Sequence, residues 1–147
     1  MNTLLCAFAL LLSTVDTASA AEALGRDLAG RPVTLGAASG PQVLVFWSTR
    51  CADCLSPVAA LQRAGLDVVL VNTDSAGERA AIAPYLRAHG IEAPVIADPT
   101  AAVQRRFGIG VGAVLVDDTG AEALRQVGIV DAVVLVDAAG QSRMAHR

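Results

Sequence analysis

Lysine is absent from this sequence, and aromatic residues are scarce. All 11 basic residues are Arg, and Phe, Trp and Tyr make up 3% of the 147 residues. The formal net charge is −3, whereas a domain that binds nucleic acid needs a basic face. We therefore expect no nucleic acid among the partners, and a core built mainly from Ala, Val, Leu and Ile.

The sequence also lacks an apolar run of the roughly 18 residues that cross a bilayer. The apolar run from Leu4 to Leu12 is shorter, and Ala18-Ser19-Ala20 follows it. This order is typical of a secretory signal with a small-residue cleavage site. We expect a signal peptide over residues 1–20 and an exported mature domain over 21–147, with no membrane span after cleavage. The alternative is an N-terminal core helix, which leaves the small-residue spacing unexplained.

Cysteine is sparse as well, and the predicted mature chain keeps only Cys51 and Cys54. A structural zinc site needs four ligands, and His89 and His146 lie far from this pair in sequence. A purely structural disulfide across so short a loop stabilises a protein little. The Cys-x-x-Cys spacing therefore favours redox exchange, and we expect no bound metal and no cofactor.

Apolar runs alternate with helical patterns, which predicts an α/β fold with a central sheet flanked by helices. Ser75 and Glu78 form a capping box, and Gly90 is a helix stop. After a lead-in hairpin around Gly30, the expected strands are 42–47, 67–72, 94–97 and 112–116, and the expected helices are 52–64, 76–89 and 99–106.

The last third of the chain contains an internal repeat with an offset of 20 residues. Phe107-Gly108-Ile109 recurs as Val127-Gly128-Ile129, and Val114-Leu115-Val116-Asp117 recurs as Val134-Leu135-Val136-Asp137. We expect a duplicated helix–strand unit over 98–117 and 118–137, followed by a polar tail. The alternative is chance similarity in a chain rich in Ala and Val.

The cysteine pair lies where the strand 42–47 is predicted to pass into the helix 52–64. Free N–H groups and the helix dipole at such a junction stabilise a thiolate. We therefore expect Cys51 to attack a partner's disulfide, and Cys54 to resolve the mixed disulfide that results.

Three neighbours of the pair are candidates for tuning it. Arg50 would stabilise a Cys51 thiolate if its guanidinium folded back, and otherwise would lie solvated at the surface. Asp53 would oppose a thiolate on either cysteine. Trp47 is expected to pack beside the site, or alternatively to contact substrate.

The segment from Phe46-Trp47 to Cys51-Ala52-Asp53-Cys54 resembles the Phe-Trp-x-x-x-Cys-x-x-Cys segment of thioredoxin-like proteins. The TlpA-type disulfide reductases of the bacterial periplasm are the most similar subgroup. The lead-in 28–35, the strand 68–74 and the helix 98–109 resemble that group more weakly. The resemblance implies a thioredoxin-like fold and disulfide exchange with protein thiols or disulfides, including those of cytochrome c maturation. It also implies a periplasmic location and a membrane or periplasmic redox partner.

The chain departs from this family at the cis-proline loop, which the family places against the cysteine pair. Counting back from the strand 112–116 puts Val111 at that position, and the second repeat puts Asp131 there. The family's terminal helix is expected to be replaced by the second repeat unit. A thioredoxin-fold binding protein that holds a partner or a metal without turnover is therefore the alternative function.

Overall fold

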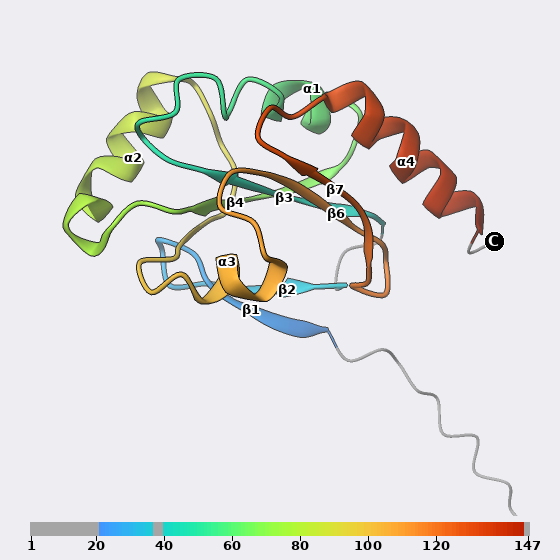
Figure 1. Ribbon diagram of the computed structural model, residues 1–147, viewed down its shortest axis with the longest axis horizontal. Coiled ribbons are helices and arrows are strands. Elements are labelled where there is room, and N and C mark those ends of the chain that lie inside the picture. The colour runs from blue at the N-terminus through green and yellow to red at the C-terminus, as the bar shows by residue number, and fades with distance from the viewer. Residues whose placement is uncertain (1–20, 37–39, 146–147) are drawn as a thin grey trace, which may run out of the picture.

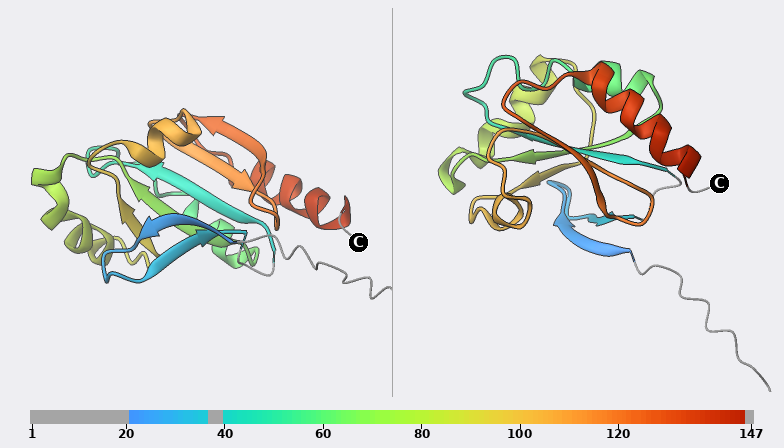
Figure 2. Two further views of the ribbon diagram at one scale, coloured as in Figure 1. Left: turned by 90° about the horizontal axis from the view of Figure 1, so that it is seen from below. Right: turned by 45° about the vertical axis from the view of Figure 1, so that its right-hand side comes forward.

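The computed structural model describes residues 21–36 and 40–145, so the predicted signal peptide lies outside the described residues. The chain forms a mixed sheet of five strands in the order β5-β4-β3-β6-β7, covered by helices on both faces (Figure 1). A two-stranded hairpin packs below that sheet (Figure 2). The predicted α/β architecture with a central sheet flanked by helices is confirmed.

The strands are β1 Glu22–Arg26, β2 Pro32–Leu35, β3 Gln42–Trp47, β4 Asp67–Asn72, β5 Val95–Ala97, β6 Gly112–Val116 and β7 Glu122–Val127. The helices are α1 Val58–Arg63, the 3₁₀ turn η1 Ala76–Glu78, α2 Arg79–Ala88, α3 Ala102–Phe107 and α4 Ala132–Ala145.

Strand β3 occupies the centre of the sheet and leads directly to the cysteine pair. It pairs in parallel with β4 and antiparallel with β6, and all six of its residues are buried. A strand covered on both faces is apolar throughout, because neither face meets water. The apolar runs of β3, β4 and β6 therefore predicted these strands with their observed bounds.

Each face of the sheet carries its own core. On the upper face in Figure 1, α1, α2 and α4 pack Val58, Leu61, Ile82, Leu86 and Leu135 against the sheet. On the lower face, α3 and the β1–β2 hairpin supply Val103, Phe107 and Leu35. Alternate residues of β3 enter alternate cores: Val43, Val45 and Trp47 face up, and Leu44 and Phe46 face down.

The helix predicted over 52–64 is wrong in its first half. Residues 52–57 form turns, in which Ser56 N–H bonds Asp53 O and Val58 N–H bonds Leu55 O, and α1 begins only at Val58. Pro57 has no N–H to donate to a preceding turn, so it opens the helix. The capping box of Ser75 and Glu78 is confirmed, and α2 ends before Gly90, whose φ is +63°.

The predicted duplication of a helix–strand unit is wrong. The residues of α3 have a strand, β7, as their counterparts at the offset of 20, and the residues of β6 have the start of α4. A tight turn at Gly120, closed by its N–H bonding Asp117 O, sends the second copy back alongside β6. The two similar segments therefore fold differently, because β6 of the first copy offers a free sheet edge, and β7 of the second copy pairs with that edge.

The expected loss of a terminal helix is also wrong. Helix α4 has 14 residues, extends to Ala145 and includes most of the segment expected to be a polar tail. Leu135 and Ala139, one turn apart, face the upper core, and Asp131 accepts a hydrogen bond from Val133 N–H at the start of the helix. Within 21–36 and 40–145, no helix is long and apolar enough to cross a membrane.

Candidate functional site

A disulfide joins Cys51 and Cys54 just beyond the end of β3. Their Cα atoms lie 5.5 Å apart, and both side chains are half-buried. The turn that carries Cys51 is closed by its own N–H, which bonds Ser48 O at 3.0 Å. The predicted juxtaposition of the two cysteines at the end of a central strand is therefore present.

The two cysteines are held in different ways. Of the pair, Cys54 alone packs against the upper core cluster of the described chain, which includes Leu55 and Val58. Cys51 follows a polar loop instead, so its sulfur is the one less engaged with the core. The predicted position of Cys51 at the start of a helix is wrong, because α1 begins after the pair and has only six residues.

The disulfide opens onto a pocket of about 460 Å³. Its lining comes from the cysteine loop on one side and from the ends of β6 and β7 on the other. Ile129, in the β7–α4 loop, is 96% exposed and is the most prominent apolar side chain beside the pocket. The full lining is Cys51, Asp53, Cys54, Ser56, Val111, Gly128, Ile129 and Val130.

Val111 and Asp131, the two candidates for the cis-proline position, lie in different places. Val111 lines the pocket beside the cysteines, and its carbonyl accepts a hydrogen bond from Gly128 N–H. Asp131 caps α4 through Val133 N–H. The structure contains no cis peptide bond within 21–36 and 40–145. Val111 is thus the residue brought next to the disulfide.

Trp47 packs in the core and not against the pocket. Its side chain is fully buried, and its ring centroid lies 5.4 Å from that of Tyr85 on α2. Since no face of the indole reaches solvent, the packing interpretation holds and a substrate contact does not.

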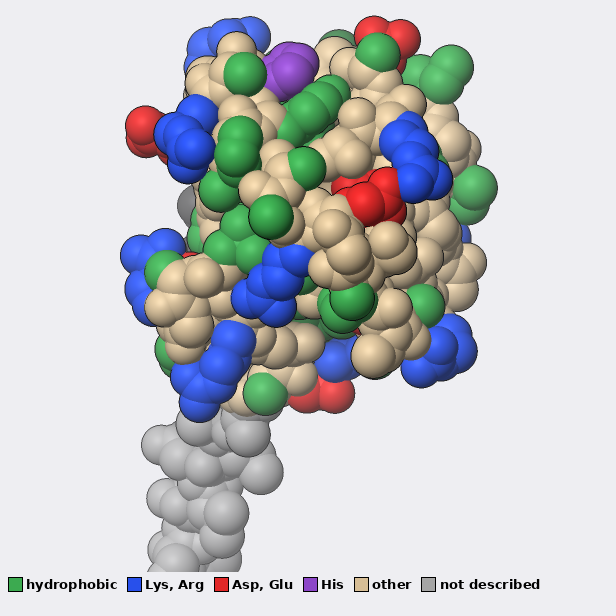
Figure 3. Space-filling view, turned by 90° about the vertical axis from the view of Figure 1, so that its left-hand side faces the viewer, with side chains coloured by type: hydrophobic (Ala, Val, Ile, Leu, Met, Phe, Trp, Pro, Cys, Tyr) green, Lys and Arg blue, Asp and Glu red, His purple; other side chains and the backbone are tan. Residues whose placement is uncertain are grey.

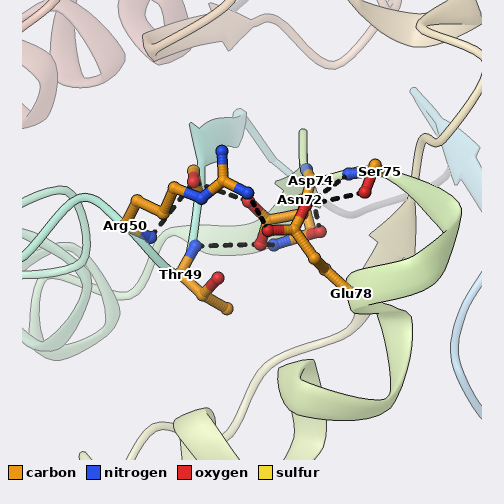
Figure 4. Close-up of polar contacts among 7 residues, drawn as sticks. Thr49, Arg50, Asn72, Asp74, Ser75 and Glu78 are labelled. Carbon is orange, nitrogen blue, oxygen red and sulfur yellow. Dashed lines mark hydrogen bonds and ion pairs between the residues drawn. The ribbon is translucent and has the colours of Figure 1, made fainter.

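Arg50 lies at the surface with 78% of its side chain exposed, so the second of the two interpretations is confirmed. Its guanidinium forms an ion pair with Glu78 across the loop (Figure 4). The hydrogen bonds from Ser75 to Glu78 and the charge of Arg50 lower the pKa of the Glu78 carboxyl. Asp53 is exposed and is the only charged residue in the lining of the pocket among the described residues.

Asp74, which was not predicted from sequence, is buried beside the loop that leads to Cys51. One carboxylate oxygen accepts from Ser48 Oγ at 2.6 Å, and the other accepts from Thr49 N–H and from Asn72 Nδ2, both at 2.9 Å. Burial alone would raise its pKa, but these hydrogen bonds outweigh it and lower the pKa to about 2. The carboxylate is therefore ionised at neutral and mildly acidic pH.

A signal for Asp74 was present in the strand pattern. Parallel strands end at the same edge of a sheet, and the register places Trp47 beside Asn72. Ser48 is the first residue after β3 and Asp74 the second after β4, so the two are expected to lie close together. Two neighbouring parallel strands that both end in polar residues thus predict a contact between those residues.

The described residues offer no group of three His, Cys, Asp or Glu side chains placed to hold a metal ion. Charged side chains of both signs are scattered among apolar ones on the face shown in Figure 3, which is the left-hand side of Figure 1. Several arginines form ion pairs: Arg31 with Asp27, Arg106 with Glu22, and Arg125 with Glu122. The basic residues therefore do not gather into one continuous surface on that face.

Solved structures share this fold at low sequence identity. A thioredoxin-like protein from Porphyromonas gingivalis matches with a TM-score of 0.68 and 18% identity, over 83% of this chain and 90% of its own. A thio-disulfide isomerase from Thermus thermophilus matches with a TM-score of 0.63 and 22% identity, over 83% and 95%. A secreted disulfide oxidoreductase from Mycobacterium tuberculosis, homologous to E. coli DsbE, matches with 0.61 and 15%, over 80% and 93%.

These matches confirm the predicted thioredoxin-like fold. No curated protein matches the sequence. The model of the AhpC/TSA family, in contrast, matches residues 15–141, which is most of the chain. With a Cys51–Cys54 disulfide at the end of its central strand, this thioredoxin-like chain belongs to the AhpC/TSA family.

Proposed function

We propose that this chain is an exported thiol–disulfide oxidoreductase that exchanges disulfides with protein substrates through Cys51 and Cys54. The observation that carries the proposal is a half-buried disulfide at the mouth of an open, largely apolar pocket. A structural disulfide gains nothing from such a pocket, whereas an exchanging one needs room for a second polypeptide.

In the reducing direction, the Cys51 thiolate attacks one sulfur of a partner's disulfide. The partner's S–S bond breaks, its leaving sulfur takes up a proton, and Cys51 becomes joined to the other sulfur. The Cys54 thiolate then attacks Cys51, the Cys51–Cys54 bond forms, and the partner leaves as a dithiol. The partner gains two electrons and this chain loses two, so a membrane or periplasmic redox partner must return them.

The pocket favours a polypeptide as the partner. Val111, Ile129 and Val130 offer apolar contact beside the disulfide, and Ile129 is almost fully exposed. A partner whose cysteine is flanked by an apolar side chain would cover these residues and remove them from water. Unfolded or extended segments, such as cytochrome c precursors with reduced or oxidised haem-binding cysteines, fit this description.

The reduction of insulin by dithiothreitol tests the proposal. We expect the wild-type protein to accelerate insulin reduction about tenfold or more, since a thiolate held beside a docking pocket outperforms a free thiol. Cys51→Ser should return the rate to that of dithiothreitol alone. Equal rates for wild type and Cys51→Ser would remove the enzymatic function.

A second candidate is a binding protein that holds a partner without turnover. It is favoured by the lack of a proline at Val111, the cis-proline candidate that lies beside the disulfide, whose carbonyl already bonds Gly128 N–H and is therefore engaged within the chain. In the same insulin assay a binding protein would be inactive in both forms. A metal assay on the reduced protein separates the metal-binding version, which should bind zinc in proportion to protein.

Export is a separate part of the proposal, supported by the apolar run and small-residue site before Ala21. When the full chain is produced in a bacterium with a secretion system, we expect the protein recovered from the periplasm to begin at Ala21. N-terminal sequencing provides the measurement. Recovery of the soluble protein with Met1 intact would contradict export.

A further inference from the structure

The loop between β3 and Cys51 is tied to the loop after β4 by a buried polar cluster, which we call the clasp. It consists of Ser48, Thr49, Asn72 and Asp74 (Figure 4 labels all but Ser48). Asn72 and Asp74 are almost completely buried, and they also bond each other through Asp74 N–H and Asn72 Oδ1 at 3.1 Å. Asp74, which accepts the hydrogen bonds from the loop, is therefore itself held in place by Asn72.

The clasp reaches Cys51 through Ser48. The Ser48 hydroxyl donates to Asp74 and accepts from Arg50 N–H at 3.1 Å, while the Ser48 carbonyl accepts from Cys51 N–H. Ser48 thus connects Asp74 to the backbone N–H groups of Arg50 and Cys51. Asp74 touches neither sulfur, so any effect it has on the disulfide must act through the backbone of this turn.

The two cysteines therefore have two separate anchors. Cys54 is held by apolar packing against the upper core, and the backbone of Cys51 is held by the clasp. Forming a disulfide requires both sulfurs to stay within bonding distance, and a loop held in place loses less conformational entropy on closure. If the loop were loosened, the dithiol form would lose more conformational entropy when the disulfide closes.

We propose that Asp74 is a positioning residue that sets the reduction potential of the Cys51–Cys54 pair by fixing the loop before Cys51. The inference rests on the proposed function only in taking this pair as the redox centre. The alternative is that Asp74 only stabilises the fold, which would leave the potential unchanged. Because hydrogen bonds hold the pKa of Asp74 near 2, the clasp keeps its charge at every pH used for such measurements.

The test is the equilibrium of the pair with glutathione. Protein disulfide plus two glutathione thiols gives protein dithiol plus glutathione disulfide, and the fractions are read by alkylating free thiols and weighing the protein. We expect Asp74→Asn and Ser48→Ala each to lower the equilibrium constant for disulfide formation about tenfold, which is about 30 mV toward a more oxidising potential. Ser48→Ala keeps the test intact if Asp74→Asn does not fold.

Asp27→Asn is the matched control. Asp27 is also a buried carboxylate with three hydrogen bonds, from Ala29 N–H, Arg31 N–H and Arg31 Nε, but it lies in the β1–β2 hairpin. It should destabilise the fold comparably in urea and leave the potential at the wild-type value. Equilibrium constants of Ser48→Ala and Asp74→Asn within about twofold of the wild-type value, or an equal shift in Asp27→Asn, would overturn the proposal. Either outcome is independent of the insulin assay, which would still report on turnover.

Discussion

Cys54→Ser is expected to accumulate a stable mixed disulfide on Cys51. Oxidised glutathione offers the reduced protein a disulfide, and attack by Cys51 releases one glutathione and leaves the other attached. In the mature chain, residues 21–147, no other thiol remains to displace it without Cys54, so we expect about nine-tenths of the protein to carry one glutathionyl group at equilibrium in excess reagent. Wild type should instead proceed to the Cys51–Cys54 disulfide and carry no adduct. Intact-protein mass spectrometry distinguishes the products.

The matched variant is Cys51→Ser, which leaves Cys54 as the only cysteine of the mature chain, residues 21–147. Because Cys54 packs against the core around Leu55 and Val58, its sulfur is less available to a second molecule. We expect its adduct to form at least tenfold more slowly than that of Cys54→Ser. Faster adduct formation by Cys51→Ser would reverse the roles given to the two cysteines.

Gly112→Ala is expected to cause the largest loss of stability of any small substitution near the site. Gly112 opens β6 with φ +136°, a conformation that residues with a Cβ rarely adopt. An added Cβ would overlap the carbonyl oxygen of Gln126 and lie 3.0 Å from the Cα of Val127. Both atoms belong to the backbone of β7, so neither can turn away. Backbone strain and overpacking together cost about 4 kcal/mol.

Urea unfolding, followed by the fluorescence of Trp47, the one tryptophan of the chain, measures this loss. Gly140→Ala provides the comparison, since Gly140 lies in α4 with open space around the position of a Cβ. There the same added methyl group should stabilise the protein by up to about 1 kcal/mol, because Ala is the better helix former. An unchanged urea midpoint for Gly112→Ala would show that β7 can move away from β6.

The sheet could be predicted from sequence because its central strands are buried on both faces. Their apolar runs have no helical period, and polar or turn residues mark both ends, as Asp67 and Asn72 do for β4. The cysteine pair was predictable for the same reason, since it follows such a strand. The turns that follow the pair could not be predicted. Pro57 shortens the helix, and whether the residues before it form turns depends on how they pack in the folded protein.

The repeat shows where local sequence is insufficient. Val114 and Val134 occupy matching positions, yet Val114 lies in a buried strand and Val134 on the exposed side of α4. Valine is compatible with either structure, and the available sheet edge decides between them. Asp74 could not be predicted for a related reason: its role depends on Ser48, which lies beside it in space but 26 residues earlier in the chain.

Helix α4 begins next to the pocket and extends away from it. Val130 lines the pocket, and the 14 residues from Ala132 to Ala145 carry the chain about 21 Å farther, at 1.5 Å per residue. A support attached at the far end of α4 would thus leave the sulfur pair facing open solution. The protein is suited to immobilisation on a bead, for capture of its clients, or on an electrode.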